Sequence, residues 1–325
     1  MKTWKLAGAA LAALLPAAAT ASGIEDAQER RTAIVRTAEL LESNYVYPER
    51  GRELAGRLRR EVDAAWVTAG GPEDFAKAFT GRLRGLSADG HFHVDFRAGG
   101  GAATEENTFG AAEFEKFYGK AVNHGFEQVR RLDGNVGYLD LRVFAPPDMG
   151  ADMAVAAMTL LAQSDALVID LRRNGGGDGA LGLLIAGYLV DGAQPMSGTY
   201  DRPSDKLTTS ATPVWVPGRR FGAAKPVYVL ISKETFSAAE AFAYDLQALK
   251  RVTVVGEPSG GGAHPFVYRQ VSEHFVLSLP EGRSINPITG KDWEGVGVIP
   301  DVRVNAELAL DEALRLARAR IAASN

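Results

Sequence analysis

The chain has 325 residues, of which 46% are hydrophobic and 23% are charged, with 36 glycines, no cysteine and a net charge of −4. The ordinary apolar fraction excludes a disordered or collagen-like chain. The lack of cysteine excludes thiol nucleophiles, disulfides and cysteine-ligated metal sites. A nearly neutral charge gives no sign of a nucleic-acid partner, and we expect none.

The first residues have the pattern of a secretory signal peptide. Lys2 and Lys5 precede an apolar run over residues 6–15, and small residues follow up to Ala21. The alternative is a short membrane anchor, which the length of the run and Pro16 disfavour. We therefore expect residues 1–21 to be removed, leaving a soluble periplasmic or secreted protein without a membrane span.

Residues 22–90 have the periodicity of a small helical domain. Apolar residues recur at helical spacing from about residue 26 to residue 86, and prolines and glycines divide the stretch into three helices. A connecting segment over residues 91–133 follows, with a loop predicted at 98–108.

Residues 134–325 alternate between short β-rich runs and helical runs. The predicted strands are 136–141, 166–171, 227–231, 252–255 and 275–279, and the predicted helices are 149–163, 179–190, 237–250 and 306–320. This alternation predicts an α/β layered fold.

A glycine-rich turn follows the apolar run that ends at Asp170. Three glycines at 175–177 allow the backbone to approach a ligand and to point N–H groups at it, which suits an oxyanion hole. A phosphate loop is disfavoured, because no Lys-Ser/Thr pair follows. Taken alone, the segment is better explained by a tight strand-to-helix turn.

Ser237 opens a predicted helix directly after another apolar strand. Its hydroxyl would lie at the positive end of the helix dipole, and the N–H of Ala238 would be free to donate to an oxyanion. The Ser-x-x-Glu pattern ending at Glu240 is also a capping box, so both residues could serve only to begin the helix. The two interpretations are compatible. The G-x-S-x-G pattern of α/β-hydrolases is absent.

Two histidines, His91 and His93, stand at a junction between loop and strand. A histidine there is free to act as a general base. A metal site formed with Asp89 and Asp95 is the alternative. Side chains along one extended strand point in parallel and rarely converge on one ion, so we expect no metal.

Several sequence blocks occur in a specific order and spacing. They are SNYVYPE at 43–49, DGHFHV at 89–94, HGFEQVRRLDGNVGYLDLRVF at 124–144, VIDLRRNGGG at 168–177, the run from 227 to 264 that contains TFSAAE and GEPSGGGAH, and WEGVGVIPDV at 293–302. Together they resemble serine peptidase family 41, the carboxyl-terminal (tail-specific) processing proteases. The likeness is greatest to the branch with interphotoreceptor retinoid-binding protein and the tricorn-protease core. The resemblance implies a ClpP/crotonase-like α/β core after a small helical domain.

The resemblance also implies roles for individual residues. Ser237 matches the nucleophile, and the N–H groups of Gly176 and Ala238 match the oxyanion hole, with Gly177 beside it. Many members use a lysine base 25 residues after the serine, but that position is Gly262 here.

The tricorn-like arrangement uses a histidine and a glutamate instead of the lysine. His91 and Glu294 stand at the matching positions, and a serine, a histidine and an orienting carboxylate form a consistent triad. His264 lies in the loop that otherwise bears the lysine, and is an alternative base or a substrate contact. Only about forty residues separate Val94 from Asn135, too few for the PDZ domain that processing proteases usually carry there.

The expected function is an exported serine endopeptidase that acts on peptide or unfolded protein substrates through an acyl-enzyme, without a cofactor. Two alternatives stay open. One is a non-catalytic binder of hydrophobic ligands, like the retinoid-binding relatives; the other is a hydrolase of esters or amides other than peptides.

Overall fold

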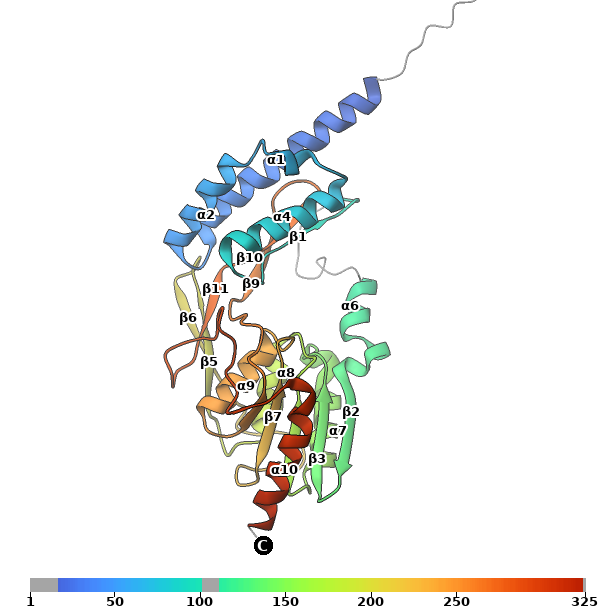
Figure 1. Cartoon of the computed structure of the whole chain (residues 1–325), viewed down its shortest axis with the longest axis vertical. Helices are drawn as coiled ribbons and strands as arrows, with labels where there is room; N and C mark the ends of the chain where they lie inside the picture. The colour runs from blue at the N-terminus through green and yellow to red at the C-terminus, as the bar shows by residue number, and fades with distance from the viewer. Residues whose placement is uncertain (1–16, 101–110, 324–325) are drawn as a thin grey trace, which may run out of the picture.

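The computed structural model describes residues 17–100 and 111–323 (Figure 1). The charged and apolar parts of the predicted signal peptide lie outside these residues, as does most of the loop predicted at 98–108. The predicted cleavage point after Ala21 falls inside helix α1 (Ala17–Asn44). Within the described ranges, no helix combines the length and the hydrophobicity that a membrane span requires.

The N-terminal layer consists of α1 and three further helices, α2 (Pro48–Arg60), α3 (Ala65–Thr68) and α4 (Pro72–Ser87). Proline occupies the first turn of α2 and of α4, where its missing N–H costs nothing. The apolar faces predicted from the sequence are buried, with no exposed surface at Ile34, Leu41, Leu58, Phe75 or Phe79. The short helix α3 is the one addition to the three helices expected.

A three-stranded antiparallel sheet completes this layer. Its order is β1 (His93–Phe96), β10 (Phe275–Pro280) and β9 (Phe266–Gln270). Phe275, Leu277 and Leu279 of β10 belong to the same hydrophobic core as α1, α2 and α4. The helical layer is therefore covered by a hairpin that comes from the C-terminal half of the chain.

The central sheet has six strands in the order β12-β8-β7-β4-β3-β2. The strands are β2 (Phe126–Leu132), β3 (Val136–Leu141), β4 (Ala166–Asp170), β7 (Val227–Ile231), β8 (Thr253–Gly256) and β12 (Val302–Arg303). All neighbours are parallel except β2, which pairs antiparallel with β3. Parallel strands covered on both faces require continuous apolar runs, and β3, β4 and β7 are buried at every position.

Helices cover both faces of the central sheet. One face packs against α7 (Pro147–Leu161), α8 (Gly179–Gly187) and α9 (Ala238–Ala248), and the other packs against α10 (Ala309–Ala322). The predicted α/β fold class with an N-terminal helical region is confirmed.

The remaining elements connect the two layers. A second small sheet, in the order β11 (Gly282–Ile285), β5 (Pro195–Asp201) and β6 (Lys206–Ala211), lies between the N-terminal helices and the central sheet in Figure 1. Helix α6 (Ala111–Tyr118) and the 3-10 helix η1 (Lys120–Gly125) lead into β2, and the short 3-10 helix η2 (Ala306–Leu308) leads into α10. The division of the chain into domains at residues 90 and 133 stays a prediction. In the structure, the β9–β10 hairpin from the C-terminal half packs with the N-terminal helices.

The close packing of α1 against α2 gives a test of this layer. A Cβ added at Gly51 of α2 would lie 2.2 Å from the carbonyl oxygen of Leu41 in α1, so the helices would have to separate. We expect Gly51→Ala to lower the free energy of unfolding by about 1–3 kcal/mol in urea titrations. The matched control is Gly81→Ala in α4, where an added Cβ meets nothing within 4 Å. That variant should gain about 0.5–1 kcal/mol. Equal stability of the two variants would contradict the packing described.

Candidate active site

Ser237 lies in a strained turn between β7 and α9. Its backbone has φ 53° and ψ −121°, a region that residues with a side chain rarely adopt. Hydrogen bonds on both sides hold the turn: the Phe236 N–H donates to the Asn174 carbonyl at 3.1 Å, and the Ser237 N–H donates to the Glu240 carboxylate at 2.9 Å. Strain of this kind, of order 1–3 kcal/mol, persists only where the surroundings impose it, and it is common at functional sites.

Glu240 ties the serine turn to the second glycine-rich loop. Besides the Ser237 N–H, its fully buried carboxylate accepts hydrogen bonds from the Ser259 hydroxyl at 2.5 Å and from the N–H groups of Gly261 and Gly262 at 2.7 and 2.8 Å. Burial raises the pKa of Glu240, and these bonds oppose the rise. The capping contact from Glu240 is thus present, and the same residue also fixes the loop at 260–262.

The first glycine turn lies against Ser237. A Cβ on Gly176 would lie 2.8 Å from the Ser237 Cβ, and one on Gly177, which has φ +120°, would lie 2.1 Å from the Phe144 carbonyl oxygen. The Gly176 N–H donates to the side-chain oxygen of Asn174 at 2.9 Å. No hydrogen bond among the described residues uses the N–H of Gly177 or of Ala238. Of the three donors expected in an oxyanion hole, Gly176 is therefore engaged elsewhere.

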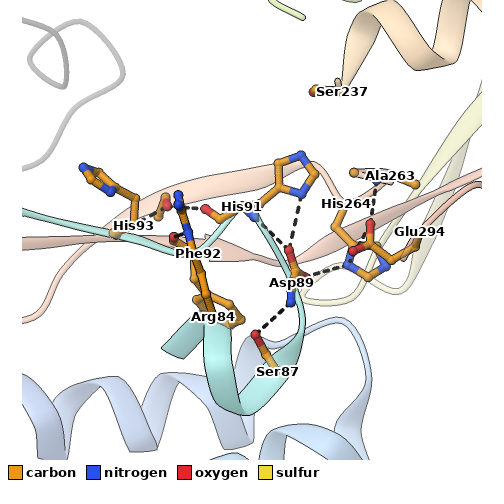
Figure 2. Close-up of polar contacts among 12 residues, drawn as sticks. Arg84, Ser87, Asp89, His91, Phe92, His93, Ser237, Ala263, His264 and Glu294 are labelled. Atoms are coloured by element: carbon orange, nitrogen blue, oxygen red, sulfur yellow. Dashed lines mark hydrogen bonds and ion pairs between the residues drawn. The ribbon is translucent and has the colours of Figure 1, made fainter. Parts of the chain in front are cut away.

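His91 lies on the opposite side of the site, directly before β1. Its ring packs against Phe236, the neighbour of Ser237, with 4.9 Å between ring centroids. Its Nδ1 is 3.3 Å from Asp89 Oδ1, and its other ring nitrogen lies on the side of Ser237 in Figure 2. No hydrogen bond or ion pair among the described residues joins an imidazole to Ser237.

His264 shares the Asp89 carboxylate with His91. Its Nδ1 donates to Asp89 Oδ2 at 2.7 Å, and its Nε2 lies 3.4 Å from the Tyr47 hydroxyl. Glu294 lies against this imidazole, with 3.5 Å between its Oε2 and His264 Nδ1, and accepts the Ala263 N–H at 2.6 Å. The structure thus places Glu294 beside His264, whereas the family resemblance paired Glu294 with His91. The carboxylate beside His91 is that of Asp89.

The ionisation of these groups is coupled through their burial. Burial favours the neutral form of the Asp89 carboxyl, but the hydrogen bond from His264 and the nearby His91 imidazole outweigh it and hold the Asp89 pKa well below its usual range. Burial likewise lowers the pKa of His264, yet the bond to Asp89 and the nearby Glu294 charge raise it overall. Burial, reinforced by the Asp89 charge, raises the pKa of Glu294. The pairing thus shifts Asp89 towards its ionised form and His264 towards its protonated form.

The loop between α1 and α2 completes the surroundings of Asp89. The Tyr45 hydroxyl donates to Asp89 Oδ2 at 3.4 Å, and the Val46 N–H donates to the Pro280 carbonyl at 3.0 Å. Arg202, in the turn after β5, donates to the carbonyl groups of Glu42 and Tyr45. The α1–α2 loop is thereby held against β10 of its own layer and against the turn after β5.

A pocket of about 350 Å³ joins most of the predicted residues. It is lined by Gly177, Gly179, Thr199, Ser237, Ala238, Ala241, Gly262, Ala263, His264, Pro265, Phe266, Ser284 and Trp293. His93 is not part of this arrangement: it is half exposed and pairs with Asp95 at 2.9 Å. The His91–His93 metal site considered from the sequence is therefore not assembled, since one ring is buried and the other faces solvent.

Comparison with known proteins now adds to this geometry. The model of peptidase family S41 matches residues 135–304, just over half of the chain. This chain belongs to peptidase family S41. The chloroplastic C-terminal processing peptidase of Tetradesmus obliquus is 30% identical over 175 residues, which cover 53% of this chain and 36% of that protein. The chain thus matches about a third of the length of that relative.

Solved structures support the fold of this S41 chain. A lipoprotein from Streptococcus agalactiae aligns with a TM-score of 0.60 at 14% identity, covering 96% of this chain and all of that one. The tricorn protease aligns with a TM-score of 0.56 at 14% identity, over 90% of this chain and 37% of that one. The family expected from the sequence blocks is confirmed, and its particular branch stays a prediction.

Sequence reasoning gave no role to Asn174 and Tyr45, and considered Asp89 only as a metal ligand. Asn174 carries a readable signal: an asparagine directly before glycines after a buried strand is typical of a side-chain-supported turn. The sequence signal for Asp89 is weaker: an aspartate two residues before a histidine. Tyr45 has no sequence signal, because its contact with Asp89 depends on how the α1–α2 loop docks.

The shared carboxylate can be tested by Asp89→Asn. This isosteric change leaves the buried imidazoles without their counter-charge, and we expect a loss of about 3 kcal/mol or more in the free energy of unfolding at neutral pH. The pKa of His264, followed by NMR titration, should fall, because Asp89 is what raises it. Asp95→Asn is the control, since it breaks the exposed pair with His93 and should cost under about 1 kcal/mol.

The same residue predicts how stability depends on pH. Because the Asp89 pKa is depressed in the folded state, its stabilisation is present above its ordinary value of 3.8 and is lost as the pH falls below that. Acid unfolding of Asp89→Asn should therefore be shallower than that of the unchanged chain. Parallel acid curves for the two proteins would contradict the pairing.

Proposed function

We propose that this S41 chain is an exported serine peptidase that forms an acyl-enzyme on Ser237 with His91 as the general base. The observation that carries the proposal is the strained Ser237 turn, which faces a pocket beside two unused N–H groups, those of Gly177 and Ala238. Export is supported by the residue pattern of positions 1–21. Peptides or unfolded proteins are the proposed substrates.

In the proposed reaction, the Ser237 hydroxyl attacks the carbonyl carbon of the scissile bond. His91 accepts the hydroxyl proton and later gives it to the departing amine, and a water molecule activated in the same way releases the acid. The N–H groups of Gly177 and Ala238 donate to the oxyanion of each tetrahedral intermediate. Preorganised donors of this kind lower the barrier because they do not reorient during the reaction.

Asp89 is the proposed orienting carboxylate. It lies beside Nδ1 of His91, where a negative charge stabilises the imidazolium that forms when His91 takes the proton. The gap between His91 and Ser237 is expected to close when substrate is bound, since catalytic hydrogen bonds are often long in the free enzyme. Glu294 acts on His264 in this scheme and has no direct contact with the base.

His91 is favoured over His264 as the base by their hydrogen-bond partners. Both ring nitrogens of His264 have a partner, Asp89 on one side and Tyr47 on the other. His91 has only Asp89 near one nitrogen, which leaves the other for Ser237. His264 lines the pocket and is proposed as a substrate contact.

Labelling by a fluorophosphonate probe tests the nucleophile. The unchanged chain should be labelled once, and Ser237→Ala should not be labelled, because only an activated serine attacks the probe. Ser204→Ala, at an exposed serine that does not line the pocket, is the control and should be labelled like the unchanged chain. Absence of labelling in every protein would favour the ligand-binding alternative. Labelling without cleavage of any peptide would favour an ester or amide hydrolase.

The base is tested by His91→Ala. Loss of a general base should lower kcat by about 10²–10⁴-fold while labelled peptide still binds. His93→Ala, two residues away and half exposed, should keep the rate of the unchanged chain. Near-normal turnover in His91→Ala would transfer the base role to His264.

A further inference from the structure

Asp89, His264 and Glu294 form a cluster of potential metal ligands. One donor atom from each lies within 4.8 Å of the others, although the residues come from three separate segments of the chain. The His264 Nδ1 is 2.7 Å from Asp89 Oδ2 and 3.5 Å from Glu294 Oε2. Donors bound to one tetrahedral Zn²⁺ are about 3.3–3.6 Å apart, given bonds of about 2.0–2.2 Å. The His264–Asp89 pair would therefore need to open by less than about 1 Å, and the His264–Glu294 pair already has this spacing.

His91 lies beside Asp89 but is not one of these mutually close donors. The His91 side chain is 4% exposed, and its Nδ1 has no hydrogen-bond partner. This nitrogen lies 3.3 Å from Asp89 Oδ1, in ion-pair range but without hydrogen-bond geometry, and Figure 2 shows it directed toward that carboxylate. Asp89 is therefore shared between His91 and the proposed ligand set.

We propose that the chain binds one Zn²⁺ through Asp89, His264 and Glu294. A set of donors that includes an imidazole nitrogen suits Zn²⁺ better than Ca²⁺ or Mg²⁺, which prefer oxygen ligands throughout. The ion replaces the proton on His264 Nδ1, which is released to solvent, and the Ala263 N–H keeps one contact with Glu294. Access is through the pocket that His264 lines.

The bound ion would act as a reversible inhibitor, a consequence that rests on the proposed function. It would occupy Asp89, so the carboxylate could no longer stabilise an imidazolium at His91. Zn²⁺ would therefore hold the base inactive without touching Ser237.

Calorimetric titration of the metal-free chain with ZnCl₂ tests the site. We expect one Zn²⁺ per chain at micromolar concentrations, and weaker binding by about tenfold or more in His264→Gln and in Glu294→Gln. Glu294→Gln keeps the shape of the side chain, so this variant still tests whether the cluster binds Zn²⁺ if His264→Gln does not fold. His93→Ala is the control, because its exposed pair with Asp95 is the nearest alternative ligand set, and binding should be unchanged. Added Co²⁺ should give the absorption bands of a tetrahedral site.

The outcomes separate this proposal from the proposed function. Titration of Ser237→Ala requires no activity, so Zn²⁺ binding there supports the site even if the chain proves not to be a peptidase. If the chain is active, Zn²⁺ should slow hydrolysis over the same concentration range in which it binds, and EDTA should restore the rate. The site is overturned by the absence of binding, by binding that Glu294→Gln leaves unchanged, or by binding that His93→Ala abolishes.

Discussion

A buried carboxylate, Asp89, is the constraint on which the arrangement of the site depends. An ionised carboxylate out of contact with water is tolerated only when donors surround it. Asp89 is 2% exposed. Its carboxylate accepts hydrogen bonds from the His264 imidazole, from the backbone N–H of His91 at 2.9 Å, and from the Tyr45 hydroxyl. These donors come from both layers of the molecule. The helical layer therefore has one docking position in which the charge is satisfied.

The serine side of the site is organised separately, by two polar residues buried in the core. Asn174 joins the glycine turn to the serine turn, and Glu240 joins the serine turn to the loop at 260–262. Neither residue contacts the helical layer's carboxylate. The two halves meet where the Phe236 ring packs on His91, so the distance between the proposed base and the proposed nucleophile follows from how the layers dock.

The parts of the fold that could be predicted are those whose sequence signal is local. Strands β3, β4 and β7 appear as short continuous apolar runs because both faces of a parallel sheet are covered. Strand β6 could not be found in this way: its sequence KLTTSA is mostly exposed and has no apolar face. Such a strand forms because β5 supplies its hydrogen-bond partners. The residues of β6 themselves give no sign of this pairing.

The same division applies to the site. The sequence by itself determined the family, the serine at a helix start and the glycine turn, because each depends on neighbouring residues and on backbone conformations that few residue types adopt. Only the tertiary structure decided that Asp89 faces two imidazoles, that Glu294 lies on His264, and that the Gly176 N–H is already engaged. Asp89 and His264 are 175 residues apart, and a contact of that range is set by how sheets and loops pack. Local sequence patterns carry no information about such packing.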